Sequence, residues 1–190
     1  MKPKASQFKG SAAAMHVALL RGINVGGKHM LPMSDLVGMF VDAGCKNVQT
    51  YIQSGNVVFA ASNVLVKRLP GAIGQQIAKR FGFQPCVIIR SADEIARVAA
   101  AHPFSRPGTD EKLLHVGFLE RAPADSLIAR LDPARSPGDR FTVKDKEIYL
   151  HFPNGVHKSK LTNAYIDSML TTTSTIRNWR TVLKVADMTG

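Results

Sequence analysis

The chain has 190 residues, of which 45% are hydrophobic and 21% are charged. These fractions are typical of a folded globular protein and exclude disorder throughout the chain. The length suits one large domain or two small ones. Two cysteines, Cys45 and Cys86, are too few for a disulfide framework, and they indicate a reducing, cytoplasmic location.

The chain is basic, because 25 lysines and arginines exceed 14 aspartates and glutamates for a formal net charge of +11. Residues 1–14 hold three of the lysines but no apolar core of a secretory signal, and we interpret them as a flexible extension. Removing three lysines from +11 leaves +8, which favours polyanionic partners, although a basic surface without a specific ligand has the same composition. No stretch approaches the roughly 18 apolar residues of a membrane span, so no membrane partner is expected.

Regular apolar spacing divides the first half into strands and helices. In chain order the prediction is a strand at 16–20, a helix between Pro32 and Gly44, strands at 48–52 and 57–59, a helix at 65–81 and a strand at 85–90. Val48, Thr50 and Ile52 alternate with more polar neighbours, which predicts a half-buried strand with these three on its buried face. Gly55-Asn56 is typical of a two-residue hairpin turn. Pro70 predicts that the second helix starts or kinks there, and the capping-box pattern Ser91–Glu94 begins a further helix.

The second half repeats this order. The prediction is a strand at 113–119, a helix at 123–131, strands at 141–144 and 147–152, a helix at 159–169, a strand at 172–176 and a last helix capped by Asn178. Both halves therefore follow the order β-α-β-β-α-β and then add a helix, which is typical of a ferredoxin-like sheet. We predict an α+β fold of two tandem ferredoxin-like units at 15–102 and 113–190, joined by a linker at 103–112. They would pack through their bare sheet faces or their extra helices.

The loop Arg21-Gly-Ile-Asn-Val-Gly-Gly-Lys28 is the densest functional signal. Gly26 and Gly27 permit backbone N–H groups to converge on an anion, and Arg21 and Lys28 add positive charge. The spacing also fits the frame of a phosphate-binding P-loop, but His29 stands where a magnesium-binding Ser or Thr belongs, which argues against that assignment. A purely structural glycine loop is the alternative.

A hairpin turn and a helix start complete the candidate site. In a ferredoxin-like sheet the hairpin after the second strand shares an edge with the loop after the first, so both would line one cleft. The last helix begins with closely spaced arginines, which suit phosphate or carboxylate binding. Turn chemistry and a solvated basic face are the structural alternatives. The predicted ligand-binding residues are Arg21, Asn24, Gly26, Gly27, Lys28, Ser54, Asn56, Arg177, Asn178 and Arg180.

Two histidines are the next candidates. His115 and His151 lie on predicted neighbouring strands, where their rings would approach on the outer face of the second sheet. A metal site or acid–base pair there is the less favoured interpretation, because no carboxylate or third ligand is evident. We therefore predict no metal site, and we assign no catalytic set or cofactor.

Four motifs carry a resemblance to a known family: Arg21-Gly-Ile-Asn-Val-Gly-Gly-Lys28, Tyr51-Ile-Gln-Ser-Gly-Asn-Val57, Lys158-Ser-Lys-Leu-Thr-Asn163 and Arg177-Asn-Trp-Arg-Thr-Val-Leu-Lys184. In this order and spacing, the chain resembles the bacterial family catalogued as domain of unknown function 1697, over about residues 15–188. The resemblance implies a cytoplasmic α+β protein with a duplicated arrangement. It supplies no established activity, substrate or catalytic set.

Three functions compete on these observations. The leading hypothesis is a binding protein for a phosphorylated ligand, a small metabolite, a nucleotide or a nucleic acid. Nucleic-acid binding would weaken steeply with salt, because phosphate neutralisation releases counterions. The alternatives are an enzyme that acts on a small anionic substrate and a structural or interaction protein whose polar motifs lock the two halves together.

Overall fold

The computed structural model describes residues 13–190. The predicted extension at 1–14 lies outside this range except for its last two residues. Among residues 13–190, no helix combines the length and apolar character that crossing a membrane needs.

The first half is built on a four-stranded antiparallel sheet with the strand order β2-β3-β1-β4. Helices α1 and α2 cover one face of this sheet, where their apolar stripes pack against alternate residues of β1 and β3. Helix α3 follows the last strand. The elements are β1 (Ala14–Leu20), α1 (Met33–Asp42), β2 (Lys46–Tyr51), β3 (Asn56–Ala61), α2 (Asn63–Phe81), β4 (Val87–Ser91) and α3 (Ala92–Ala100).

The second half has the same element order and the equivalent strand order, β6-β7-β5-β8, again antiparallel. Helices α4 and α5 cover the outer face of its sheet, and α6 follows the last strand. The elements are η1 (Glu111–Leu113), β5 (Leu114–Leu119), α4 (Asp125–Ile128), β6 (Arg140–Lys144), β7 (Glu147–His151), η2 (Val156–Lys158), α5 (Asn163–Leu170), β8 (Ser174–Asn178) and α6 (Trp179–Asp187).

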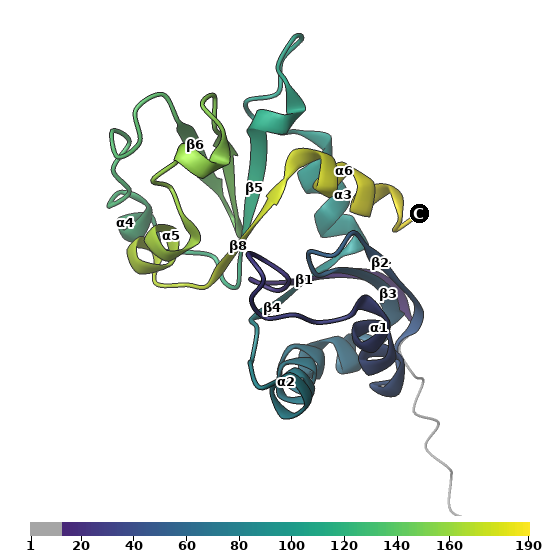
Figure 1. Cartoon of the computed structure of the whole chain (residues 1–190). Helices are drawn as coiled ribbons and strands as arrows, with labels where there is room; N and C mark the ends of the chain where they lie inside the picture. The colour runs from purple at the N-terminus through teal and green to yellow at the C-terminus, as the bar shows by residue number, and fades with distance from the viewer. Residues whose placement is uncertain (1–12) are drawn as a thin grey trace, which may run out of the picture.

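The two halves share one hydrophobic core between them. Val17 and Leu19 of β1 belong to the same buried cluster as Val116 and Phe118 of β5, with Trp179 of α6 beside them. Helices α3 and α6 contact each other in this middle layer, whereas the other helices lie on the outer faces (Figure 1). Both predicted modes of packing, bare sheet faces and extra helices, therefore occur together.

The α+β class and most elements are confirmed, but several boundaries were wrong. Helix α2 begins at Asn63, because Ser62 caps it by accepting a hydrogen bond from the backbone N–H of Leu65. The helix then continues past Pro70 to Phe81. Helix α4 is only four residues long, and α5 begins at Asn163 after a short 3₁₀ turn. The caps at Ser91 and Asn178 are confirmed.

The hairpin between β2 and β3 differs from the prediction. Strand β2 ends at Tyr51 and β3 begins at Asn56, so the loop has four residues rather than the two predicted. Ile52, expected on the buried face of the strand, adopts a left-handed conformation with φ of 48° and is 52% exposed. A β-branched side chain is unfavourable there and costs on the order of 1–3 kcal/mol. Alternation alone predicted burial, and the turn overrode it.

The predicted approach of His115 and His151 is also wrong. In the register of β5 and β7, His151 pairs with Leu114, and His115 pairs with Leu150. Adjacent residues on a strand face opposite sides of the sheet, so the two histidines point to opposite faces. His115 packs on the ring of Phe152, on the side covered by α4 and α5.

Gly55 closes the hairpin against β1, and this contact makes its substitution a direct test of the fold. A Cβ there would lie 2.8 Å from Leu20 Cβ, and φ is 73°. We expect Gly55→Ala to lower the free energy of unfolding by about 2 kcal/mol or more. Gly71→Ala on α2, with nothing within 4 Å of the added methyl group, should raise it by up to about 1 kcal/mol. Urea unfolding measures both, and equal effects would contradict this account of the turn.

Candidate functional site

A cleft of about 510 Å³ lies where the loop after β1 and the β2–β3 turn face the segment 156–163 and the start of α6. Each of the four sequence motifs contributes to its wall. The lining residues are Gly22, Ile23, Val25, Ile52, Ser54, His115, Val156, Ser159, Leu161, Thr162, Asn163, Ile176, Arg177, Asn178 and Thr181. Segments far apart in the sequence are thus brought to one place.

Arg177 of β8 forms the buried part of this wall, with 9% of its surface exposed. Its side chain crosses into the first half, where Nη2 donates to the carbonyl oxygens of Leu20 at 2.6 Å and Ser54 at 3.1 Å. Nε donates to Asn56 Oδ1 at 2.7 Å. Nη1 donates to the Thr175 hydroxyl at 2.8 Å and to the Ile176 carbonyl at 3.0 Å, so all five N–H groups have acceptors.

The charge of Arg177 has no carboxylate partner. All its acceptors are neutral, and no ion pair of the described residues includes it. Burial lowers the pKa of Arg177 to about 10, because the guanidinium loses contact with water. The side chain is therefore still charged at neutral pH.

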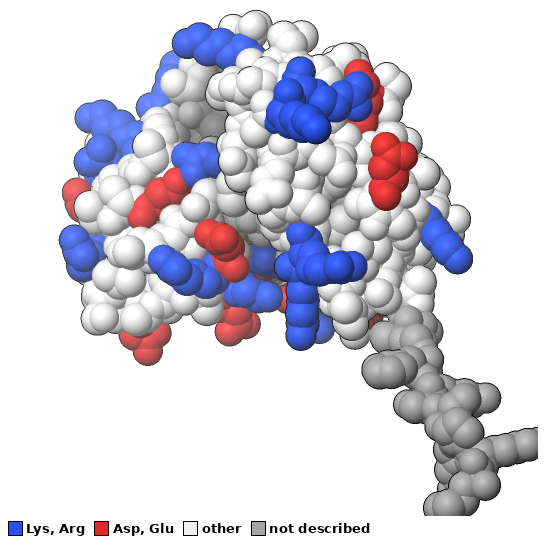
Figure 2. Space-filling view, turned by 90° about the horizontal axis from the view of Figure 1, so that it is seen from below, with Lys and Arg blue, Asp and Glu red and all other residues white. Residues whose placement is uncertain are grey.

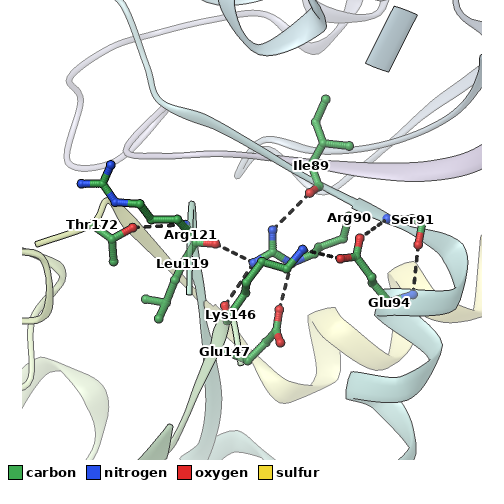
Figure 3. A network of polar contacts seen from close by, with 9 residues as sticks. All are labelled: Ile89, Arg90, Ser91, Glu94, Leu119, Arg121, Lys146, Glu147 and Thr172. Atoms are coloured by element: carbon green, nitrogen blue, oxygen red, sulfur yellow. Dashed lines mark hydrogen bonds and ion pairs between the residues drawn. The ribbon is translucent and has the colours of Figure 1, made fainter. Parts of the chain in front are cut away.

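Arg90 of β4 makes the equivalent contacts in the second half (Figure 3). Its Nη2 donates to the carbonyl oxygens of Leu119 at 2.6 Å and Lys146 at 3.0 Å, and Nη1 donates to that of Ile89 at 3.1 Å. Leu119 ends β5 as Leu20 ends β1, and each arginine directly precedes the cap of a helix. Each half thus inserts one arginine into the hairpin of the other.

The two sites differ in two contacts. Arg177 donates to the Thr175 hydroxyl, whereas the residue two positions before Arg90 is Ile88, which has no hydroxyl. The second difference changes the charge. Arg90 Nε donates to Glu147 Oε1 at 2.8 Å in a buried ion pair, whereas Arg177 Nε meets the neutral amide of Asn56. Glu147 and Asn56 both occupy the first residue of the strand that follows the hairpin. Arg90, which comes from the first half, is thus neutralised, and Arg177, which comes from the second half, is not.

The cleft beside Arg177 favours an anion. Helices α5 and α6 begin at its wall, where Thr162 and Asn178 cap them, and helix N-termini carry partial positive charge. No aspartate or glutamate of residues 13–190 lines it. A second cleft of about 450 Å³ beside the neutralised arginine is lined by three basic and three acidic residues, which are Arg97, Lys144, Lys146, Glu94, Asp145 and Glu147. Acidic side chains therefore balance the basic ones in the second cleft but not in the Arg177 cleft.

The sequence and the fold can now be compared with known proteins. A family model described as "Protein of unknown function (DUF1697)" matches residues 14–149. The chain belongs to this family. The solved structure of the conserved bacterial protein SP0830 from Streptococcus pneumoniae is similar to this chain with a TM-score of 0.71 and 22% identity, covering 94% of this chain and 100% of that one. At that identity the likeness shows the fold alone. No curated protein matches the sequence.

In this DUF1697 member, the glycine-rich loop is a tight turn. The backbone N–H of Lys28 donates to the Val25 carbonyl at 3.0 Å, and the residues between, Gly26 and Gly27, have φ of 58° and 72°. Positive φ at both central residues is what a type I′ turn requires, which gives these glycines a structural reason. The Asn24 side chain holds the loop in place through hydrogen bonds to the backbone of Leu31 and Gln53. No helix follows Lys28 directly, since α1 begins at Met33.

The predicted gathering of cations in one pocket is wrong. Arg21 pairs with Asp167 of α5, and Arg180 lies 3.9 Å from Asp110 and 3.8 Å from Glu111. Lys28 is exposed outside the cleft lining. Of the predicted residues, Ser54, Arg177 and Asn178 line the cleft, and Asn56 lies behind them on Arg177. Ligand contacts of the others remain predictions.

Sequence reasoning missed the apolar residues of the lining, and it considered His115 only as a partner of His151. The pKa of His115 is lowered by burial, and its ring sits between the Leu113 carbonyl, 3.4 Å from Nδ1, and the Asn178 amide, which donates to Nε2 at 3.4 Å. The strand alternation identified the face of His115 but not what covers it. Within residues 13–190, no group of three or more His, Cys, Asp or Glu side chains is placed to hold a metal ion.

Two buried neutral histidines give the fold a pH dependence. The pKa of His102 is lowered by burial, and both its ring nitrogens are engaged, Nε2 with the His115 carbonyl at 3.1 Å and Nδ1 with the Phe104 N–H at 3.3 Å. Protonation would break the second contact. Because these histidines have lower pKa values folded than unfolded, acid favours the unfolded state.

We therefore expect the free energy of unfolding to fall as the pH drops from 7 through about 6.5, the unfolded pKa, toward 5. His102→Gln removes one titrating group and keeps a donor for the His115 carbonyl, so its stability should depend less on pH. Urea unfolding at several pH values measures this dependence. Identical slopes for the variant and the wild type would exclude His102 as a contributor.

Proposed function

We propose that this protein binds a small anionic ligand, in the first place a phosphorylated metabolite or nucleotide, in the cleft beside Arg177. One observation carries the proposal: a buried, charged guanidinium with no carboxylate partner stands in the wall of a cleft that no acidic residue lines. Burying an uncompensated charge is unfavourable, and an anion in the cleft would offset that cost.

The groups around Arg177 have the chemistry that such a ligand needs. The arginine has no N–H group to spare, so it supplies charge rather than a hydrogen bond. Direct contacts would come from the side chains of Ser54, Ser159 and Thr181, which line the cleft, and from the first turns of α5 and α6. A volume of about 510 Å³ lies in the range of pockets for small molecules and cofactors.

The surface charge supports a small ligand over a nucleic acid. On the face in Figure 2, lysine and arginine side chains lie in separate groups with acidic side chains between them, rather than in one continuous basic stripe. A stripe or patch that follows the phosphate backbone is the usual footprint of nucleic-acid binding.

Two further proposals concern the setting of the site. We infer that each half is a ferredoxin-like unit, which is supported by the strand orders β2-β3-β1-β4 and β6-β7-β5-β8 with the helices α1, α2 and α4, α5 on the outer faces. Both cysteines are free thiols, which supports the proposed cytoplasmic location.

Asn163→Asp tests the proposed anion site. Asn163 is the first residue of α5 and lines the cleft, and its Oδ1 accepts a hydrogen bond from the Ser174 hydroxyl at 3.1 Å. Aspartate has the same shape, keeps that acceptor and is favourable at a helix N-terminus, but it adds a negative charge to the cleft. We expect it to weaken anion binding roughly tenfold or more. Calorimetric titration with AMP, phenyl phosphate and inorganic phosphate measures the change.

Asn47→Asp is the matched control, since it adds the same charge at an exposed position outside the cleft lining and aspartate tolerates the local φ of 51°. It should bind as the wild type does. The melting temperatures without ligand show whether both variants are folded. The proposal fails if none of the three anions binds the wild type at millimolar concentration, or if Asn163→Asp and its control bind equally.

A further inference from the structure

Exposed apolar side chains gather at the mouth of the Arg177 cleft. Val25 is 64% exposed, Ile52 is 52% exposed and Val156 is 48% exposed, and all three line the cleft. They make up half of the large hydrophobic side chains that are exposed among residues 13–190. Scattered single hydrophobic residues need no explanation, but this grouping around one cavity indicates an interaction site.

The three side chains come from independent parts of the chain. Val25 belongs to the loop after β1, Ile52 to the β2–β3 turn, and Val156 to η2 of the second half. Ile52 is also held at a φ of 48°, where asparagine or glycine would be at ease. Neither the fold nor local conformation accounts for an exposed isoleucine at this position. Contact with a ligand does account for it.

Deeper in the cleft, both apolar and positively charged groups form the wall. Ile23, Leu161 and Ile176 continue the apolar lining, while Arg177 and the starts of α5 and α6 supply the positive charge. A phosphate group by itself fills a small part of about 510 Å³ and leaves the apolar walls wet. The complementary ligand therefore has a charged head and an apolar body.

We infer that the cleft selects a phosphate monoester whose organic part is apolar, an aryl or alkyl group, over inorganic phosphate and polyol phosphates. This inference rests on the proposed function. The phosphate would lie near Arg177, and the apolar group would contact Val25, Ile52 and Val156. Ile52 is then a specificity-determining residue, because it contacts the part of the ligand that differs between these phosphates. Burying apolar surface of the ligand against it supplies the discrimination.

The test compares two phosphate monoesters of similar size, phenyl phosphate and glycerol phosphate, by calorimetric titration. The wild type should bind phenyl phosphate about tenfold more tightly. Ile52→Asn removes the apolar contact and relieves the backbone, because asparagine tolerates a positive φ. It should weaken phenyl phosphate binding about fivefold, leave glycerol phosphate binding unchanged and raise the melting temperature by a few degrees.

Val64→Asn is the matched control. Val64 is 67% exposed on α2 and lies outside the cleft lining, so this variant should bind both phosphates as the wild type does. Equal affinity of the wild type for the two phosphates, or equal effects of the two substitutions, would overturn the inference while leaving the anion site standing. If neither phosphate binds but AMP or inorganic phosphate does, the inference fails and the anion site stands, whereas both proposals fail if none of these anions binds. Sedimentation velocity tests whether a second copy of this chain, rather than a small ligand, covers Val25, Ile52 and Val156. Self-association that Ile52→Asn abolishes would identify these residues as an interface between copies and overturn the inference.

Discussion

The reciprocal insertion of two arginines holds this molecule together. Arg90 reaches from the first half to the ends of β5 and β7, and Arg177 reaches from the second half to the ends of β1 and β3. Each guanidinium binds main-chain carbonyl groups of the other half's sheet and hairpin. Because both arginines lie beside the shared core, their contacts fix the two sheets against each other where hydrophobic packing alone would permit sliding. The Arg177 cleft lies where the two halves meet in this way.

The two halves place their arginines at equivalent positions, and the partner of Nε separates their charges. Glu147 neutralises Arg90, whereas Asn56 offers Arg177 an amide. The first pair costs the desolvation of two charges and recovers most of it as an ion pair. The second leaves a positive charge that the protein itself does not compensate. A structural role explains the Arg90 site completely, and it leaves the charge, the lining and the strained Ile52 of the Arg177 cleft without a reason.

The sequence predicted the neighbourhood of the site better than its contacts. The motifs around Gly22 and Ser54 were expected at one sheet edge, and they do line one cleft, together with Asn178. Their arginines and lysine were expected there too, but Arg21 is paired with Asp167, a residue 146 positions away that no local pattern connects with it. Likewise, the alternation of Ile52 with its neighbours predicted a buried side chain. Ile52 is exposed instead, because the turn begins at that residue, where Gly55 packs on Leu20.

By itself the sequence determined what depends on neighbours along the chain: the order of strands and helices, and the caps at Ser91 and Asn178. These follow from local hydrogen bonds and backbone preferences. Only the tertiary structure decided which cations keep their charge unpaired, since Arg177 meets Asn56 across 121 residues and His115 faces away from His151 through the strand register. Charge pairing and register depend on contacts between distant segments, and single-sequence patterns do not encode those distances.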